Sequence, residues 1–264
     1  MRRLTRPLRS LRNSLCAVRW QQNPSGVRHL ERWISEKARA TPAGAIVLDA
    51  GSGLAPFRHH LAHTQYESAD HLKNESSYHP PTYACDLSNI PVAARRFDRI
   101  MCTQVLEHVP DPEAVLREFS RVLKDDGEIW LSAPLFFEEH EGPQDFFRYT
   151  QWGFRRIGQQ AGLEVEELEW LEGYHATLAH QLSMAAQELS TSHVTRVARW
   201  YDFVPLHLLV FALRIQFGLL ARLFTMLDQR EPDTRHGMCI NYRMVLRKPH
   251  GEKRRDEEGT AQPA

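Results

Sequence analysis

A short stretch near the middle of the chain gathers side chains suited to acid–base chemistry. It lies between two phenylalanine pairs, at positions 136–137 and 146–147. Its polar and titratable residues are Glu138, Glu139, His140, Glu141, Asp145, Arg148 and Tyr149. Apolar walls that hold a few polar groups are typical of small-molecule pockets. The stretch is therefore predicted to form the wall of an acceptor pocket, in which Phe137 and Arg148 bind the substrate.

Two histidines are the leading candidates for a general base. The unperturbed pKa of histidine lies near neutrality, so His140 is the first candidate and His108 the second. Asp145 and Tyr149 complete the predicted catalytic set. Other interpretations stay open: His140 as a surface histidine in a loop, and His108 as a structural residue at a helix start. Arg148 is suited to bind an acidic sugar or phosphate through two hydrogen bonds, or to pair with Asp145.

The residues that could hold a cofactor begin at positions 46–55, which read I-V-L-D-A-G-S-G-L-A. An apolar strand here runs into a turn with Gly51 and Gly53, where bare backbone lets a ligand approach closely. A helix is expected from Phe57 to Ala62, and its first amides favour negative or polar groups. Asp49 ends the strand and either orients the turn or meets a positive ligand group. A purely structural glycine turn is the alternative.

Two further acids follow predicted strands. Asp70 ends a strand at 66–70, about 20 residues past the glycine turn, where a carboxylate accepts hydrogen bonds from a ribose diol in dinucleotide sites. Asp86 lies near the end of a strand predicted at 83–87. An ordinary acid at the end of a strand would look the same.

The remaining elements indicate the fold that must position these residues. Strands are predicted at 97–105, 128–133, 163–168 and 238–248, and helices at 27–40, 112–123 and 150–161. A glycine turn at 124–127 is expected to end the helix at 112–123. Strands that alternate with helices favour an α/β doubly wound, mainly parallel sheet, with ligands at the carboxyl ends of the strands.

Taken in order, several motifs resemble those of class I S-adenosylmethionine-dependent methyltransferases. They are D-A-G-S-G at 49–53, the acid at 70, C-D-L at 85–87, F-D-R-I-M-C-T-Q-V-L-E-H-V at 97–109 and R-V-L-K-D-D-G-E-I-W-L-S-A-P at 121–134. The resemblance covers about Gly44 to Trp170, with a last strand at 238–248. It implies a Rossmann-like, seven-stranded methyltransferase sheet with a helical insertion before the last strand, and S-adenosylmethionine as the cofactor.

The family also implies roles for individual residues. Gly51 and Gly53 would pass the methionine and ribose portion, and Asp70 would bind the ribose hydroxyls. The adenine amino group would meet Asp86 with Leu87 beside it, while Gln104 and Val105 would line the methionine side. Asp49 is included among the cofactor residues. Ala55 and Pro56 stand where dinucleotide folds often carry a third glycine, which argues against a nicotinamide-dependent oxidoreductase.

The segment from His140 to Thr150 resembles the H-E-x-P-x-D-F-F-R-Y-T segment of family members found with polysaccharide and lipid-linked sugar biosynthesis. The predicted reaction is therefore methyl transfer to a hydroxyl of a sugar, glycan or lipid-linked small molecule. A non-catalytic, membrane-associated partner protein with the same fold is the alternative from a different class.

Two segments outside the core are candidates for contact with a membrane. The first, 1–40, is basic and then helical; its arginines fit a membrane-surface helix, a transit peptide or a solvated tail. The second is a strongly apolar helix at 203–227, within an insertion at 170–237 that also holds a helix at 173–189. It is either a lid on the domain or an interfacial helix with a stripe of His207, Arg214 and Arg222. The run 208–213 is too short to span a bilayer.

Composition excludes several other classes. The 264-residue chain has 33 Lys and Arg against 33 Asp and Glu, so no net field favours nucleic acid. Its four cysteines form no C-x-x-C pair, so we expect no metal site of that type. We also expect a cytoplasmic protein. If the apolar helix is interfacial, the protein is peripheral at the membrane. The expected units are 1–40, a core at 41–169, the insertion at 170–237, a last strand at 238–249 and a disordered tail at 250–264.

Overall fold

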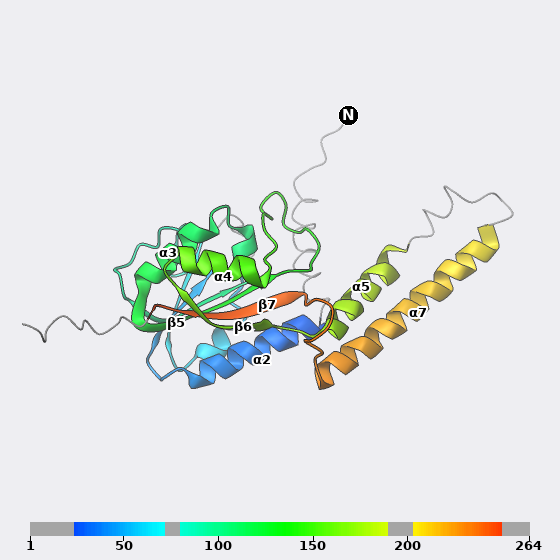
Figure 1. The fold of residues 1–264 in the computed structure, drawn as a ribbon, viewed down its shortest axis with the longest axis horizontal. Coiled ribbons are helices and arrows are strands. Elements are labelled where there is room, and N and C mark those ends of the chain that lie inside the picture. The colour runs from blue at the N-terminus through cyan, green and yellow to red at the C-terminus, as the bar shows by residue number, and fades with distance from the viewer. Residues whose placement is uncertain (1–23, 72–79, 190–202, 250–264) are drawn as a thin grey trace, which may run out of the picture.

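The computed structural model describes residues 24–71, 80–189 and 203–249, and its core is a single seven-stranded sheet (Figure 1). The strands lie in the order β3-β2-β1-β4-β5-β7-β6. Their bounds are β1 Ile46–Ala50, β2 Gln65–Asp70, β3 Tyr83–Ala84, β4 Phe97–Thr103, β5 Leu123–Pro134, β6 Glu164–Trp170 and β7 Asn241–Arg247. The pairs from β3 to β5 are parallel, and β7 runs antiparallel to both β5 and β6. The prediction of a mainly parallel, doubly wound sheet is confirmed.

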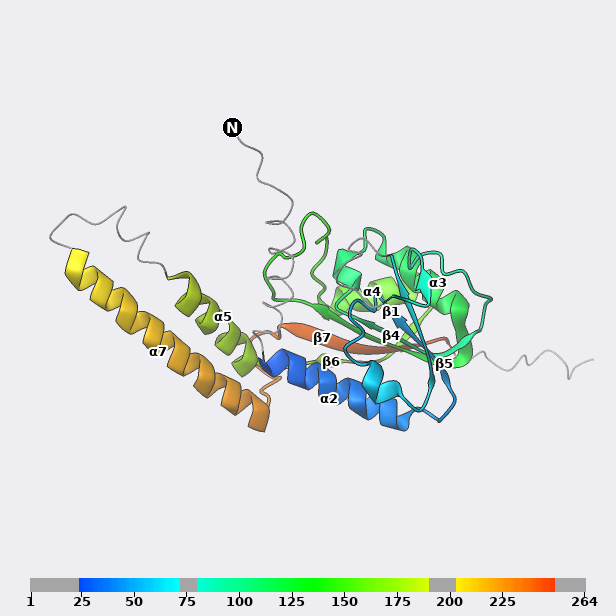
Figure 2. The same ribbon diagram turned by 180° about the vertical axis from the view of Figure 1, so that it is seen from behind.

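Helices cover both faces of this sheet (Figures 1 and 2). Their bounds are α2 Pro24–Ala40, α3 Pro112–Val122, α4 Gln151–Gln160, α5 Tyr174–Glu188 and α7 Phe203–Arg230, with short 3₁₀ turns η1 Arg58–Leu61 and η2 Leu106–His108. Helices α3 and α4 lie on one face, and α2 with η1 lies on the other. The expected basic helix before residue 24 and the tail at 250–264 lie outside the described residues.

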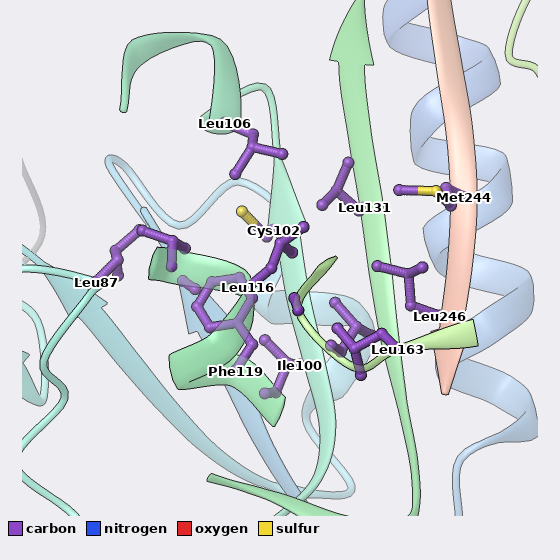
Figure 3. Packing of buried hydrophobic residues seen from close by; sticks show 14 of the residues in the cluster. Leu87, Ile100, Cys102, Leu106, Leu116, Phe119, Leu131, Leu163, Met244 and Leu246 are labelled. Atoms are coloured by element: carbon purple, nitrogen blue, oxygen red, sulfur yellow. The ribbon is translucent and has the colours of Figure 1, made fainter. Parts of the chain in front are cut away.

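Side chains that alternate along the strands feed two separate cores. Leu48 and Cys102 point to the α3 and α4 side, whereas Val47 and Met101 point to the α2 side. Figure 3 shows the first core, where Phe119 of α3 lies among strand residues. Because successive side chains of a strand face opposite ways, an apolar run without polar alternation requires cover on both faces.

The end of α3 differs from the prediction. Its start is capped by Asp111, whose carboxylate accepts a hydrogen bond from the Ala114 amide at 2.9 Å. The helix ends at Val122, and the chain enters β5 at once, so the glycine turn predicted at 124–127 is wrong. Gly127 is instead required for packing, since a Cβ there would lie 2.6 Å from Leu123 Cδ1.

Several other elements are shorter than predicted, among them β7, which spans Asn241–Arg247 and not 238–248. The helix expected at Phe57 to Ala62 is only the 3₁₀ turn η1, which follows Ala55 in the left-handed region at φ +52°. Strand β3 ends at Ala84, because Asp86 Oδ1 accepts hydrogen bonds from Ser88 N and Oγ, both at 2.8 Å, and turns the chain away. Strand β4 ends at Thr103, before Gln104 at φ +55°.

The insertion before β7 forms a helical hairpin of α5 and α7 that extends away from the sheet in both views (Figures 1 and 2). Asp228 of α7 fixes its base: Oδ2 lies 3.0 Å from His29 Nε2 of α2, and Oδ1 accepts a hydrogen bond from Ala176 N at 3.2 Å. Within the described residues, Leu206–Arg230 is long and apolar enough, by length and composition, to cross a membrane, and only 11% of its apolar window is buried against the rest of the protein. The apolar part of this helix is thus longer than the uninterrupted run at 208–213, which by itself was judged too short to span a bilayer.

Candidate functional site

The glycine turn after β1 lies against the residue that follows β4. Gly51 has φ +76°, and a Cβ there would lie 2.4 Å from Val105 Cγ2. Only glycine combines this left-handed conformation with such close contact. The turn and the end of β4, which the resemblance assigns to one cofactor site, therefore lie next to each other.

Asp70 is joined directly to the same turn. Its Oδ2 accepts a hydrogen bond from the Gly53 amide at 2.9 Å, and its Oδ1 accepts one from the His71 amide at 2.7 Å. A carboxylate has about four lone-pair sites, so these two bonds leave acceptor capacity for hydroxyl groups. The remaining acceptor sites of Asp70 fit the two hydroxyls of the ribose of S-adenosylmethionine.

Asp49 has a structural environment. It is buried, and its Oδ2 accepts a hydrogen bond from the Tyr66 hydroxyl at 2.6 Å. Burial raises the pKa of Asp49 to about 7, the Tyr66 hydrogen bond opposes this shift, and the charge of Asp70 adds to it. Of the two roles expected for Asp49, the geometry favours orienting the end of β1.

Asp86 and Leu87 lie in the turn beyond β3, at the carboxyl edge of the sheet. Asp86 is exposed, whereas Leu87 is buried in the core beneath α3. Gln104 lies at the same edge. Its backbone N–H donates to the Ser132 carbonyl at 2.8 Å, and its side-chain Nε2 donates to Ser132 Oγ at 3.2 Å. A left-handed glutamine is uncommon, and such conformations concentrate at functional sites.

The segment after β5 is held together by Arg148. Its guanidinium binds Asp145 through two bonds of 2.6 and 2.8 Å, and it also donates to the carbonyls of Phe137, Glu138 and Phe147. The pairing with Asp145 that the sequence left open is present, and it keeps the pKa of Asp145 below its usual range although burial opposes it. Arg148 thus shapes the segment, and its role in substrate binding stays a prediction.

His140 and His108, the two candidate bases, lie together. Their ring centroids are 4.7 Å apart with the rings nearly perpendicular, and Phe137 lies edge-on to His140 at 5.3 Å. Burial, followed by the neighbouring charge of His108, lowers the pKa of His140 below 6.5. A base with a lowered pKa is unprotonated at neutral pH, as proton abstraction requires.

Tyr149 is less accessible than predicted for a catalytic group. It is buried, and its hydroxyl donates to the Leu106 carbonyl at 3.0 Å. Burial raises its pKa far above 10, so it does not supply a phenolate near neutral pH. The geometry gives Tyr149 the task of tying the segment after β5 to η2.

Sequence reasoning missed Glu107. It is fully buried, and among the described residues neither of its carboxylate oxygens has a hydrogen-bond partner. Burial raises its pKa to about 8, against the smaller opposing effects of its own backbone amide and of the Arg148 charge. Its place in the L-E-H-V segment was the available signal, but its burial depends on residues 144–149, whose Phe146 amide donates to the Glu107 carbonyl at 2.8 Å.

The strand order, the antiparallel β7, the glycine turn after β1 and the acid that ends β2 together define the class I fold of S-adenosylmethionine-dependent methyltransferases. Comparison with known proteins agrees: residues 48–131 match the model of a methyltransferase domain. Residues 48–131, which run from β1 into β5, are thus similar to a methyltransferase domain, and S-adenosylmethionine is the cofactor of that class.

Individual relatives cover only part of the molecule. A ubiquinone biosynthesis O-methyltransferase of Coxiella burnetii is 29% identical over 122 residues, which are 42% of this chain and 50% of that protein. The chain thus spans about half the length of the curated relatives it matches.

Solved structures show likeness of fold alone. The [4+2]-cyclase SpnF has a TM-score of 0.51 at 16% identity, covering 83% of this chain and 80% of that one. A Bacillus halodurans protein classed provisionally as a methyltransferase has a TM-score of 0.50 at 16% identity, covering 83% and 98%.

Proposed function

We propose that this protein transfers a methyl group from S-adenosylmethionine to a hydroxyl of a small-molecule acceptor, namely a sugar, glycan or lipid-linked intermediate. The observation that carries the proposal is the ring contact between His140 and His108 of η2. His108 lies three residues past Val105, whose side chain is next to Gly51. This arrangement supports a base near the expected position of the methyl donor.

The chemistry is an in-line displacement. The acceptor hydroxyl gives its proton to the base, and its oxygen forms a bond to the methyl carbon. The bond between that carbon and the sulfonium sulfur breaks, and its electron pair stays on sulfur as the thioether of S-adenosylhomocysteine. Because the methyl group is already activated, the protein mainly aligns the reactants and removes the proton.

Two alternatives remain in view. The [4+2]-cyclase with a similar fold illustrates that fold alone does not fix the reaction. A nicotinamide-dependent oxidoreductase is disfavoured by Ala55 in place of a third glycine. A non-catalytic partner protein would bind the cofactor tightly without turnover on any acceptor.

Calorimetric titration with S-adenosylhomocysteine tests the cofactor site. We expect micromolar binding by the wild-type protein and its loss in Asp70→Ala. Asp126→Ala is the matched control, since this exposed acid lies at the opposite end of the sheet. No binding by a folded wild-type protein would overturn the proposal. Assays of methyl transfer to sugar-nucleotide and lipid-linked acceptors then separate an enzyme from a binding protein.

We also propose that the α5–α7 hairpin attaches this otherwise cytoplasmic protein peripherally to a membrane. Six apolar side chains of α7 recur at steps of three or four residues and are 45–64% exposed: Leu208, Phe211, Ile215, Leu219, Leu223 and Met226. Such a continuous exposed stripe is typical of helices that lie in the lipid interface. Arg214 and Arg222 on the same helix would favour anionic lipid headgroups.

Vesicle flotation tests this contact. We expect wild-type protein to float with vesicles of mixed anionic phospholipids and the double variant Ile215→Asp, Leu219→Asp to remain in solution. Gln216→Asp is the control, because it adds a charge on α7 beside the stripe. Absence of wild-type flotation at low salt would refute the membrane contact without affecting the cofactor assignment.

A further inference from the structure

One carboxylate and two imidazoles meet just past the end of β4. Glu107, His108 and His140 each offer one ligand atom, and the three atoms lie within 4.8 Å of one another. His108 Nε2 is 3.8 Å from Glu107 Oε1. Two of the residues belong to η2 and the third to the segment after β5, so the cluster forms only when that segment folds over η2.

The carboxylate of Glu107 has an unusual environment. It is completely buried, yet neither oxygen receives a hydrogen bond from any described residue. Arg148, a nearby cation, donates to Asp145 and to backbone carbonyls instead. Because burying an unpaired charge is costly, such a carboxylic acid either keeps its proton, as the raised pKa of Glu107 indicates for the metal-free site, or gives it up to coordinate a metal ion.

The hydrogen bonds of the two histidines leave one nitrogen of each ring available. His108 Nδ1 lies 2.6 Å from the Gln144 carbonyl, and His140 Nδ1 lies 3.1 Å from the Glu138 carbonyl. A carbonyl only accepts, so Nδ1 carries the proton in each ring and Nε2 keeps its lone pair. Metal-binding histidines show this arrangement, in which a backbone carbonyl fixes the tautomer and orients the ring.

We propose that Glu107, His108 and His140 bind one divalent transition-metal ion, with Zn²⁺ the best fit to two imidazoles and one carboxylate. Three protein ligands leave an open position, as catalytic rather than structural zinc sites do. No spacing motif predicts this site, since the ligands are split between positions 107–108 and 140 and include no cysteine.

The chemical role of the ion rests on the proposed function. An acceptor hydroxyl that ligates the ion at its open position loses its proton more readily, and that proton leaves to solvent. The resulting alkoxide attacks the methyl group as described above. The ion would thus replace the free imidazole of the proposed function as the group that activates the hydroxyl, and His140 would act by holding the ion.

A second group in the described residues, Glu31, His59 and His60, has similar composition and provides an internal control. His59 is exposed, and its ring lies 3.9 Å from that of His60 on the α2 side of the sheet. It lacks a buried, unpartnered carboxylate, so we expect it to bind the ion more weakly.

The test uses the full-length protein stripped with EDTA, dialysed against ZnCl₂ and analysed for zinc by mass spectrometry. We expect one tightly held Zn²⁺ per chain. Glu107→Gln and His140→Ala should each weaken binding by at least about tenfold, since even outer-shell losses reach that size. His59→Ala should keep wild-type affinity. The visible absorption of the Co²⁺-loaded protein should disappear in His140→Ala, a loop variant that leaves the core intact.

Failure to bind zinc, or zinc lost in His59→Ala but retained in Glu107→Gln and His140→Ala, would overturn the metal site. Titration of the stripped protein with S-adenosylhomocysteine separates the two proposals. Cofactor binding without zinc binding would refute only the metal site, whereas zinc binding without cofactor binding would refute only the methyltransferase function.

Discussion

Gly51 lies directly beneath Val105, so close that a single added methyl group would lie 2.4 Å from the valine Cγ2. This contact joins the turn after β1 to the residues after β4. Gly51→Ala would meet both this overlap and the left-handed conformation at φ +76°. We expect a loss of about 2–4 kcal/mol in unfolding free energy and of measurable S-adenosylhomocysteine binding.

Thermal melts and calorimetry of Gly44→Ala supply the comparison for that variant. Gly44 has φ +79° but no neighbouring atom within 4 Å of an added Cβ. It should therefore lose only the conformational part, about 1 kcal/mol, and keep cofactor affinity. Equal losses of unfolding free energy in the two variants would show that the Val105 side chain moves aside at little cost, which would contradict the prediction.

His140→Ala tests the proposed acceptor chemistry. The variant lacks the imidazole, which either acts as the base or holds the metal ion. Turnover should therefore fall by about 10²-fold or more, because proton removal contributes on that scale. S-adenosylhomocysteine affinity should stay within about twofold, since the hydrogen bonds of His140 are to Asp145 and Glu138 of its own segment. Steady-state rates and calorimetry check the two parts, and unchanged turnover would remove His140 from the mechanism.

Arg148→Ala should loosen the segment after β5. The Asp145 side chain is only 4% exposed, so losing its bidentate partner leaves a buried charge unpaired. We expect a loss of about 2–4 kcal/mol in denaturant unfolding, and a raised KM for the acceptor. Arg117→Ala, which breaks the exposed pair with Glu113, should cost under about 1 kcal/mol. Similar values for the two variants would contradict the structural role of Arg148.

Glu172 predicts a pH dependence of stability. It is fully buried, and burial raises its pKa to about 7 although hydrogen bonds from Asn241 N and Nδ2 oppose the shift. The folded state therefore holds a proton that the unfolded state has released between about pH 4.5 and 7. The contribution of this group to stability falls as the pH rises through that range and is constant above it.

Glu172→Gln should remove that dependence. Its amide can donate to Asn241 Oδ1, which lacks a partner among the described residues, once the asparagine amide turns over. We expect the variant to be more stable than the wild type above pH 7, by on the order of 3 kcal/mol at most, and to match it near pH 5. Urea melts across pH 5–8 check this, and parallel curves for the two proteins would refute the raised pKa.

The sequence was most informative where burial alone sets the structure. Val47 and Leu48, or Met101 and Cys102, face two different cores, so an uninterrupted apolar run was sufficient to predict a central strand. It was least informative where one side chain redirects the backbone. Asp86 turns the chain out of β3, and Ala55 adopts a left-handed conformation that alanine rarely shows.

The candidate site divides in the same way. Gly51 and Asp70 could be predicted because the turn and the strand end that hold them are local features of the sequence. Glu107 could not, because its burial results from residues about forty positions later that fold across η2. Arg148 was ambiguous for a related reason. From the sequence alone, an arginine near an aspartate can either bind a substrate or form a structural ion pair, and only the folded loop distinguishes the two.

The insertion enters and leaves the sheet between two strands that are already neighbours. Trp170 of β6 pairs with Tyr242 of β7, and the Leu171 amide donates to the Asn241 carbonyl at 2.9 Å. An antiparallel pair needs no more than a short turn to connect it. The hairpin is thus an interchangeable module: evolution can lengthen, shorten or replace it without changing the order of the strands in the sheet.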